Sequence, residues 1–276
     1  MIYANGDNGP NRESHASIIA GVKSCFAIAA VVAAFAWSAN GLQFDFSSME
    51  QGRASMVEYL RQMVPTRVSD ITYDIRSARG LLPALVATLQ MGIFGSVLGT
   101  ALALPTSCFA ARTELIPWPI SSAIKLCLNM ARAIPTIVYA LLAISLIGLG
   151  APAGAMAIAF GTFVTLSKLF AEALESVPVG PIEAVRAAGG NSLQIFVFAM
   201  LPQVFPSFLS NALYNLEYNF RDSFIVGIVG AGGLGFELLN DVRIYKLADA
   251  GVIIVLIIVL VNVVDYASHK VRAALV

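Results

Sequence analysis

Three long apolar stretches without Asp, Glu, Lys or Arg restrict what this chain can fold into. They cover residues 81–111, 133–167 and 193–216, and each is long enough to cross a hydrocarbon core of roughly 30 Å. Hydrophobic residues make up 58% of the 276 residues and charged residues only 12%. A soluble enzyme of this size could not bury so much apolar surface, so the sequence predicts a polytopic, all-α membrane protein.

The charged and metal-binding residue types exclude several other functions. Lys plus Arg equals Asp plus Glu at 17 each, whereas nucleic-acid partners require clustered basic surface. The three cysteines lie in or beside apolar segments without C-x-x-C spacing, and the two histidines lie near the chain ends. We therefore expect inert thiols and no metal or other cofactor. None of the five lysines follows a glycine, so the chain lacks the G-K-[ST] motif that holds ATP phosphates.

The N-terminal part of the chain has two interpretations. Residues 1–16 are polar and predict a disordered cytoplasmic tail. Residues 17–40 predict a first transmembrane helix, but their uninterrupted apolar part, 25–39, also has the length of a signal-peptide core. The long polar segment before it favours a retained span. Residues 41–75 then form a hydrophilic periplasmic connection, in which the apolar spacing over 49–63 predicts an amphipathic surface helix.

Five further spans are predicted after this connection. They cover residues 81–111, 128–147, a segment after the glycine-rich hairpin 148–154 that ends near 175, 193–217 and 247–267. Residues 113–122 read as a short interfacial link before the third span, and the apolar segment 224–236 is too short to cross and predicts a re-entrant or broken helix. In the second span, Gly92, Gly95 and Gly99 form a face that another helix can approach closely. Six spans place both termini on one side, which the basic tail 269–276 marks as cytoplasmic.

A polar break at residues 176–192 separates the fourth and fifth spans. It contains the pattern E-A-x-x-x-x-G from Glu183 to Gly189. Pro181 suits the first position of a helix, so we expect a helix from Pro181 to about Gly189, with Glu183 in the first turn near the positive end of the helix dipole. Three small residues allow close contact with a partner protein: Ala184, Ala187 and Ala188. A plain interfacial loop helix is the alternative.

Several separated motifs resemble the permease subunits of phosphonate and phosphite ABC importers over about residues 75–268. In chain order they are Arg132-Ala133-Ile134-Pro135-Thr136, residues 168–173 leading into the coupling pattern, residues 213–221, and residues 229–235. The resemblance implies a type I ABC transmembrane domain over residues 76–268. The chain departs from the family pattern at Leu216, where an aromatic residue is frequent, and at Asp222 and Ser223, where small residues are usual.

The same resemblance implies a function and partners. The chain would be a non-catalytic permease of the inner membrane that dimerises and is driven by two ATPase subunits docked on the 183–189 helix. A periplasmic or lipid-anchored binding protein would deliver a small oxyanion. Permeases of D-methionine importers share the R-x-I-P and G-A-G-G-L-G elements and are the nearest alternative. A passive channel and an integral-membrane enzyme are the alternatives from other classes, although the scattered charges offer no nucleophile and base pair.

Candidate residues of the translocation path come from polar or flexible positions within the apolar spans. They are Arg132, Pro135, Thr136, Glu217, Arg221, Gly230, Gly232 and Gly233. A guanidinium at a kinked helix could meet an oxyanion in transit, but Arg132 could equally anchor its span to lipid headgroups. Glu217 and Arg221 are spaced as an i, i+4 pair and are expected mainly to neutralise each other.

Two other patterns favour structural roles. Lys168, Glu172 and Glu175 share one helix face near the cytoplasmic end of the fourth span, which predicts a structural ion pair. Residues 230–235 satisfy G-x-G-x-x-G literally, but a dinucleotide site also requires a βαβ unit. Between two spans, the glycines instead favour a flexible bend whose amides face a pore.

Overall fold

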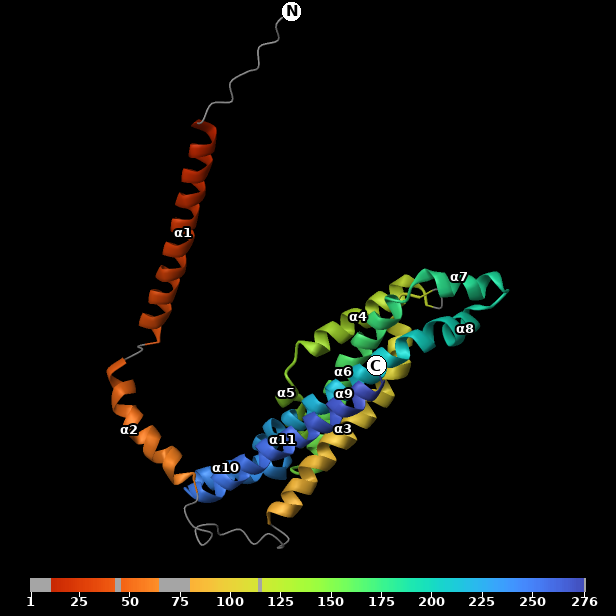
Figure 1. The fold of residues 1–276 in the computed structure, drawn as a ribbon. Helices are drawn as coiled ribbons and strands as arrows, with labels where there is room; N and C mark the ends of the chain where they lie inside the picture. The colour runs from red at the N-terminus through yellow and green to blue at the C-terminus, as the bar shows by residue number, and fades with distance from the viewer. Residues whose placement is uncertain (1–10, 43–45, 65–79, 114–115, 276) are drawn as a thin grey trace, which may run out of the picture. The chain divides into compact units, whose positions relative to one another are not determined.

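A computed structural model describes residues 11–42, 46–64, 80–113 and 116–275. Every regular element among these residues is a helix, which confirms the predicted fold class. The chain divides into two compact units, residues 1–59 and 60–276. The first unit holds α1 (Asn11–Gly41) and most of α2 (Phe46–Gln62). The second unit holds α3 (Leu81–Ala110), α4 (Trp118–Arg132), α5 (Thr136–Ile147), α6 (Ala151–Glu175), α7 (Val179–Ala187), α8 (Ser192–Gln194), the π-helical turn η2 (Ile195–Met200), α9 (Leu201–Val226), the π-helical turn η3 (Gly227–Ala231), α10 (Gly233–Arg243) and α11 (Leu247–Leu275) (Figure 1).

The number of membrane-spanning segments agrees with the predicted six. Five helical segments of the described residues are long and apolar enough to cross a membrane: Lys23–Gly41, Leu81–Ala110, Ala151–Glu175, Ser192–Ala231 and Leu247–Ala273. The bent pair α4 and α5 passes the same test when it is counted as one span. Each segment overlaps one predicted span, and Ser192–Ala231 also includes part of the segment 224–236 that was predicted to be broken.

The third span, predicted over residues 128–147 with a kink beside Pro135, is two helices rather than one. It consists of α4 and α5, whose axes differ by 87°, and α4 begins at Trp118, inside the segment predicted as a link. Pro135 explains the bend, because it lacks an amide hydrogen and its ring disfavours a helical residue before it. Pro135 itself is extended, with φ −61° and ψ 146°, and caps the start of α5.

Several other boundaries differ from the prediction. The fifth span does not end at residue 217 but continues to Val226, and Asn219, Asp222 and Ser223 on its last turns are buried. The predicted broken segment follows, where Gly230 leaves the helical region at φ 111°. α1 begins at Asn11, so residues 11–16 are helical rather than a disordered tail, while residues 1–10 lie outside the described residues. α2 contains most of the predicted amphipathic stretch, and residues 65–75 of the connection lie outside the described residues.

Close approach of α3 and α6 forms the centre of the larger unit, with α9 packed against both. A Cβ on Gly95 would lie 2.6 Å from Ile158 Cγ2, and one on Gly99 would lie 2.6 Å from the Ala159 carbonyl oxygen. Gly92 meets the ring of Phe220 instead. The predicted glycine face is therefore a true helix-packing surface. Along this bundle, α7 and α8 lie at one end and α10 lies at the other (Figure 1).

Substitution of Gly99 by alanine should destabilise the folded protein. The new methyl group would collide with backbone of α6, which cannot move aside without separating the two helices, and we expect a loss of about 1–3 kcal/mol in the free energy of unfolding. The melting temperature of the purified protein in detergent measures this effect. Gly161→Ala is the matched control, because its Cβ would lie 3.6 Å from the nearest atom, Thr136 Oγ1. Equal melting temperatures for the two variants would contradict the packing described here.

Candidate functional site

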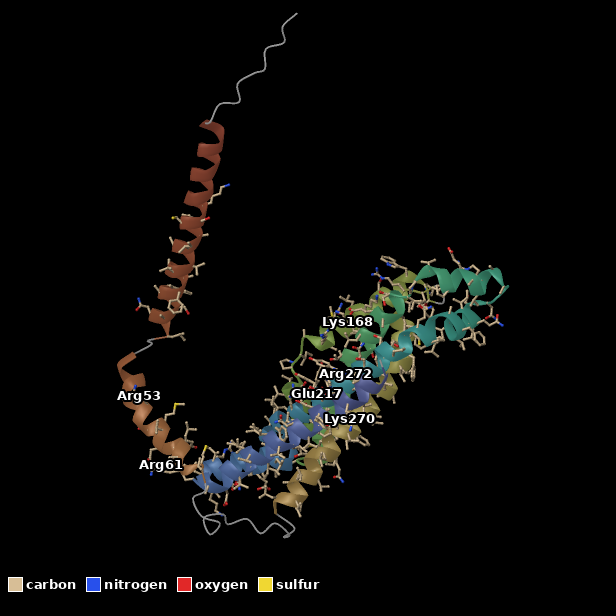
Figure 2. The ribbon with its side chains drawn as sticks, viewed as in Figure 1. Arg53, Arg61, Lys168, Glu217, Lys270 and Arg272 are labelled. Atoms are coloured by element: carbon tan, nitrogen blue, oxygen red, sulfur yellow. The ribbon has the colours of Figure 1, made fainter. Side chains whose placement is uncertain are left out.

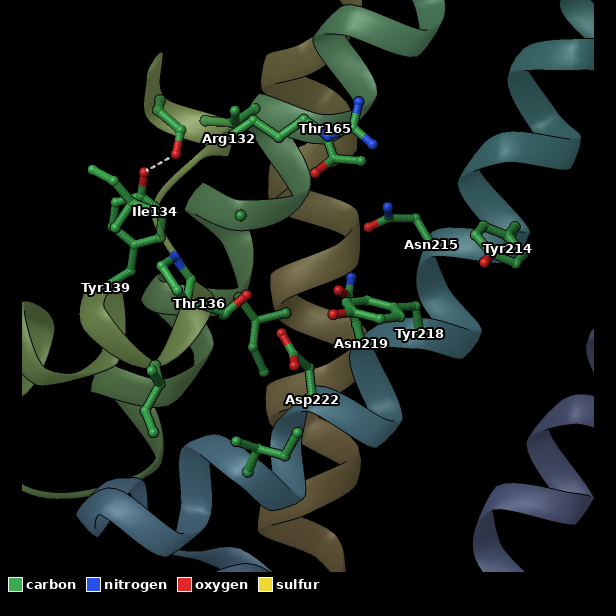
Figure 3. Close-up of a pocket in the computed structure, with 17 residues that line it drawn as sticks. Arg132, Ile134, Thr136, Tyr139, Thr165, Tyr214, Asn215, Tyr218, Asn219 and Asp222 are labelled. Atoms are coloured by element: carbon green, nitrogen blue, oxygen red, sulfur yellow. Dashed lines mark hydrogen bonds between the residues drawn. The ribbon is translucent and has the colours of Figure 1, made fainter. Parts of the chain in front are cut away.

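A cavity of about 520 Å³ lies where the bend between α4 and α5 faces α6 and α9 (Figure 3). Apolar side chains form part of its wall, and a band of polar side chains crosses it. The polar lining residues are Arg132, Thr136, Tyr139, Thr165, Tyr214, Asn215, Tyr218, Asn219 and Asp222. Three of the predicted path residues, Arg132, Pro135 and Thr136, therefore lie together at this cavity.

The bend at Pro135 positions the first part of the lining. Arg132 is the last residue of α4, and Thr136 is the first residue of α5, so both side chains lie at the open corner between the two helices. The hydroxyl of Tyr139 donates a hydrogen bond to the carbonyl oxygen of Ala131 (Figure 3). The same carbonyl also accepts from the backbone amide of Ile134 at 3.0 Å, where the last turn of α4 ends. The Tyr139 hydrogen bond therefore stabilises the bend between α4 and α5.

α9 supplies the opposite wall through residues spaced at i, i+4 and i+7. Asn215, Asn219 and Asp222 are exposed by only 5%, 3% and 7%, so they face the interior of the unit. The amide nitrogen of Asn219 donates to the hydroxyl oxygens of Ser96 on α3 and Thr162 on α6, at 2.7 Å each. Because this one side chain joins three helices, the position of the α9 wall is fixed relative to the packed pair α3 and α6.

Two hydrogen-bond acceptors on this wall are incompletely used within the described residues. Asn215 Oδ1 is buried and has no partner among them. The carboxylate of Asp222 lines the same cavity as the Thr136 hydroxyl, and it belongs to no ion pair in the described part of the chain. Sequence reasoning did not select Asn215 or Asp222 as path residues. Their polar, helical spacing within an apolar span is the signal that would have found them.

Glu217 and Arg221, although predicted as path candidates, lie on another face of α9 and do not line the cavity. Arg221 Nη2 lies 3.0 Å from Glu217 Oε1 and 2.6 Å from Asp265 Oδ2 on α11. Arg272, also on α11, approaches Glu217 Oε2 to 3.5 Å (Figure 2). The pairing of Glu217 with Arg221 is as predicted, and its role here is to join α9 to α11.

The predicted glycine candidates form a backbone bend away from the cavity. Gly230, Gly232 and Gly233 have φ values of 111°, 82° and 72°, which only glycine adopts readily. The amide of Gly150 donates to the carbonyl of Gly230 at 3.2 Å, and the Leu234 amide donates to the Thr88 hydroxyl at 2.9 Å. The bend is therefore tied to α3 and to the hairpin before α6.

α7 contains the predicted coupling pattern, but its start differs. The helix runs from Val179 with Pro178 as its N-cap, so Pro181 is not the first residue and Glu183 lies beyond the first turn. Pro178 is as suitable for a helix start as Pro181 and comes first in the chain. Gly189 has φ 83° and ends the helix by a reversal of direction. None of the residues of α7 is buried, and Glu183, Ala184 and Ala187 are exposed on it.

Ion pairs near the α7 end of the bundle involve the residues predicted to share one face. Lys168 Nζ lies 3.9 Å from Glu172 Oε1 and donates to Asn129 Oδ1 at 2.7 Å. Glu175 instead pairs with Lys125 on α4. These contacts join α4 to α6, so the interpretation as structural pairs is confirmed.

Comparisons with known proteins give a consistent result. The chain is 36% identical to the phosphite transport system permease protein PtxC of Stutzerimonas stutzeri over 200 residues, which cover 72% of each chain. It is 34% identical over 219 residues to the phosphate-import permease PhnE of Mycolicibacterium smegmatis, covering 78% of this chain and 39% of that protein. A D-methionine transport system permease, MetI of Vibrio cholerae, is 29% identical over 196 residues, which cover 67% of this chain and 87% of that protein.

A solved structure shows the same fold. The inward-facing MetNI methionine ABC transporter matches with a TM-score of 0.62 at 24% identity, covering 71% of this chain and 96% of that chain. Residues 103–271, which are more than half of the sequence, match the family described as binding-protein-dependent transport system inner membrane component. The chain therefore belongs to this family of inner-membrane transport components.

Proposed function

We propose that this chain is the membrane-spanning permease subunit of an ATP-driven importer and that it passes a phosphite- or phosphonate-type oxyanion through the inner membrane. Two observations support this substrate class. The more similar relatives compared above carry phosphite or phosphate, whereas the methionine permease is more distant. The cavity also presents one guanidinium, on Arg132, and arginine is the side chain best suited to an oxyanion.

The position of Arg132 at the bend is the observation that carries the proposal. Its side chain lines the cavity, and no hydrogen bond or ion pair of its guanidinium is seen among the described residues. A single cation of this kind attracts an anion without holding it tightly. Weak binding is what a transport path requires, because a tightly bound anion would not be released.

The motor lies on another chain in this proposal, since the sequence has no P-loop. α7 is the docking site for an ATP-hydrolysing subunit, with Glu183, Ala184, Ala187, Ala188 and Gly189 at or next to the contact. Two such subunits serve a dimer of this chain, and a binding protein on the periplasmic side delivers the oxyanion. α7 and both termini then face the cytoplasm.

α9 links the proposed motor contact to the cavity. From Asn191 the chain continues without interruption through α8 and η2 into α9, and Asn191 and Gln194 cap its start by reciprocal hydrogen bonds. A movement of α7 therefore displaces the helix that carries Asn215, Asn219 and Asp222. ATP-driven closure of the motor would open and close the cavity to alternate sides by this connection, which is a coupling between two remote sites.

Charge reversal at Glu183 should abolish transport without preventing membrane insertion. Glu183→Lys places a cation on the exposed face proposed to contact the ATPase, so ATP-dependent phosphite uptake into proteoliposomes with the ATPase and binding protein should fall to background. Co-purification of the ATPase should fall with it. Arg243→Glu is the matched control, because it reverses the charge of an exposed side chain in the last turn of α10, outside α7. Normal uptake by Glu183→Lys would refute the assignment of α7.

Replacement of Arg132 should reduce uptake while the ATPase stays bound. Arg132→Gln removes the only guanidinium of the described cavity wall, and loss of a charge-assisted hydrogen bond predicts a fall of at least about tenfold in phosphite uptake. Arg132→Lys should restore part of the activity, because it keeps the charge but loses the bidentate geometry. Arg243→Gln, at the exposed end of α10, is the control. Unchanged uptake by Arg132→Gln would remove the cavity from the transport path.

Two measurements distinguish the alternative functions. A channel would pass phosphite without ATP, so uptake that persists after ATP is withheld would favour a channel over an importer. Calorimetric titration of the partner binding protein with phosphite, methylphosphonate, phosphate and methionine separates the substrate classes. Tight binding of methionine with no binding of the phosphorus oxyanions would replace the proposed substrate with methionine.

A further inference from the structure

The cavity wall carries a positive charge on one side and hydrogen-bond acceptors on the other. Attraction of an anion alone does not explain the acceptors. Arg132 supplies positive charge at the end of α4, whereas the α9 side presents acceptors, namely the carboxylate of Asp222 and the carbonyl oxygen of Asn215. Figure 3 shows Arg132 and Asp222 apart along the wall, with Asn215 and Thr136 at intermediate positions. A fully ionised oxyanion that reached this wall would meet repulsion on one side.

The buried carboxylate of Asp222 requires hydrogen-bond donors around it. Its residue is 7% exposed, and a buried carboxylate is costly unless donors surround it. Thr136 provides one hydroxyl, and no cation pairs with Asp222 within the described residues. Acceptor capacity of this carboxylate therefore remains for a donor that enters the cavity.

Asn215 gives an independent indication of the same kind. Its residue is 5% exposed, and its Oδ1 has no partner among the described residues. Buried side-chain acceptors in folded proteins are nearly always satisfied, and Asn215 is the only residue of the cavity wall with such an unsatisfied atom among the described residues. The amide of the neighbouring Asn219 is already committed to Ser96 and Thr162. Hence this wall offers the acceptors of Asn215 and Asp222 to a donor in the cavity, beside the hydroxyls of Tyr214 and Tyr218.

We propose that Asp222, assisted by Asn215, determines the specificity of this cavity by accepting a hydrogen bond from an oxyanion that still carries a hydrogen-bond donor. The inference rests on the proposed transport function and adds a selection rule to it. Phosphorus oxyanions suit the rule because their last ionisation lies near neutral pH, at a pKa of roughly 6 for phosphate monoesters. Arg132 then binds the charged oxygens while the P–OH group donates to Asp222. Sulfate carries no proton at neutral pH and is excluded.

Weak binding to the purified permease–ATPase complex tests the rule without the selectivity of the binding protein. Line broadening of the ³¹P resonance of phosphite at neutral pH reports exchange with the cavity, and sulfate competition appears as narrowing of that line. With the wild-type complex, the ³¹P resonance of phosphite should broaden, and an equal concentration of sulfate should not narrow this resonance. With Asp222→Asn, whose amide can donate to sulfate, sulfate should compete at least about tenfold better, the size expected for one hydrogen bond to a charged group.

Two further variants separate a binding role from a structural one. Asn215→Leu removes an acceptor without adding a donor, so it should weaken phosphite binding without admitting sulfate. Glu172→Gln removes a carboxylate outside the cavity and should match the wild type. Because an ammonium group could also donate to Asp222, 2-aminoethylphosphonate and ethylphosphonate are compared. If Asp222→Asn binds phosphite more weakly, the P–OH group is the donor to Asp222. If the variant binds only 2-aminoethylphosphonate more weakly, the ammonium group is the donor.

The failure of this inference can be told from failure of the transport function. If Asp222→Asn excludes sulfate as strongly as the wild type does, and if its phosphite binding is unchanged, the selection rule is wrong. Absence of phosphite broadening in the wild type also overturns it when ATP-dependent phosphite uptake is intact. If the wild type shows no ATP-dependent uptake of any phosphorus oxyanion, the proposed function itself is wrong.

Discussion

The absence of water from a hydrocarbon core is the constraint on which this structure depends. Each backbone amide and carbonyl at membrane depth must be satisfied within the protein, so spans are helices and departures from the helix need a specific partner. The bend before α5 follows this rule, because Tyr139 binds a carbonyl at the end of α4. The glycine bend after η3 follows it as well, because Gly150 and Thr88 supply its partners. One of these two departures from regular helix lines the polar cavity.

A rigid frame surrounds the bend in the third span. Small residues let α3 and α6 approach until a methyl group would no longer fit at Gly95 or Gly99, and Asn219 ties α9 to both. Packing against these helices, rather than intrinsic rotamer preference, fixes the side chains that project between them. The same helix leads back through η2 and α8 toward α7, so the cavity wall and the exposed helix belong to consecutive helices of one stretch of chain.

Part of the proposed site could be found from the sequence because its signals are local. Arg132, Pro135 and Thr136 are consecutive or nearly so, and a proline after an arginine within an apolar stretch already predicts a disturbed helix. Glu217 and Arg221 carried the same kind of signal, an ionised side chain in a span, but Asp265 and Arg272 from α11 bind them. Which charges pair across helices depends on contacts between residues more than forty positions apart, and no local pattern contains that information.

The sequence by itself determined the class of protein, the approximate positions of the spans, the close-packing glycines and the exposed helix between the fourth and fifth spans, because hydropathy and residue size act over one or two turns. Only the tertiary structure decided how sharply the third span bends, that Asn215 and Asp222 line one cavity with Arg132, and that Glu217 does not. The direction of each helix face depends on how neighbouring helices pack, and this is set by long-range contacts such as the Asn219 bridge. The fold therefore decided which way these side chains point, and their identity alone did not.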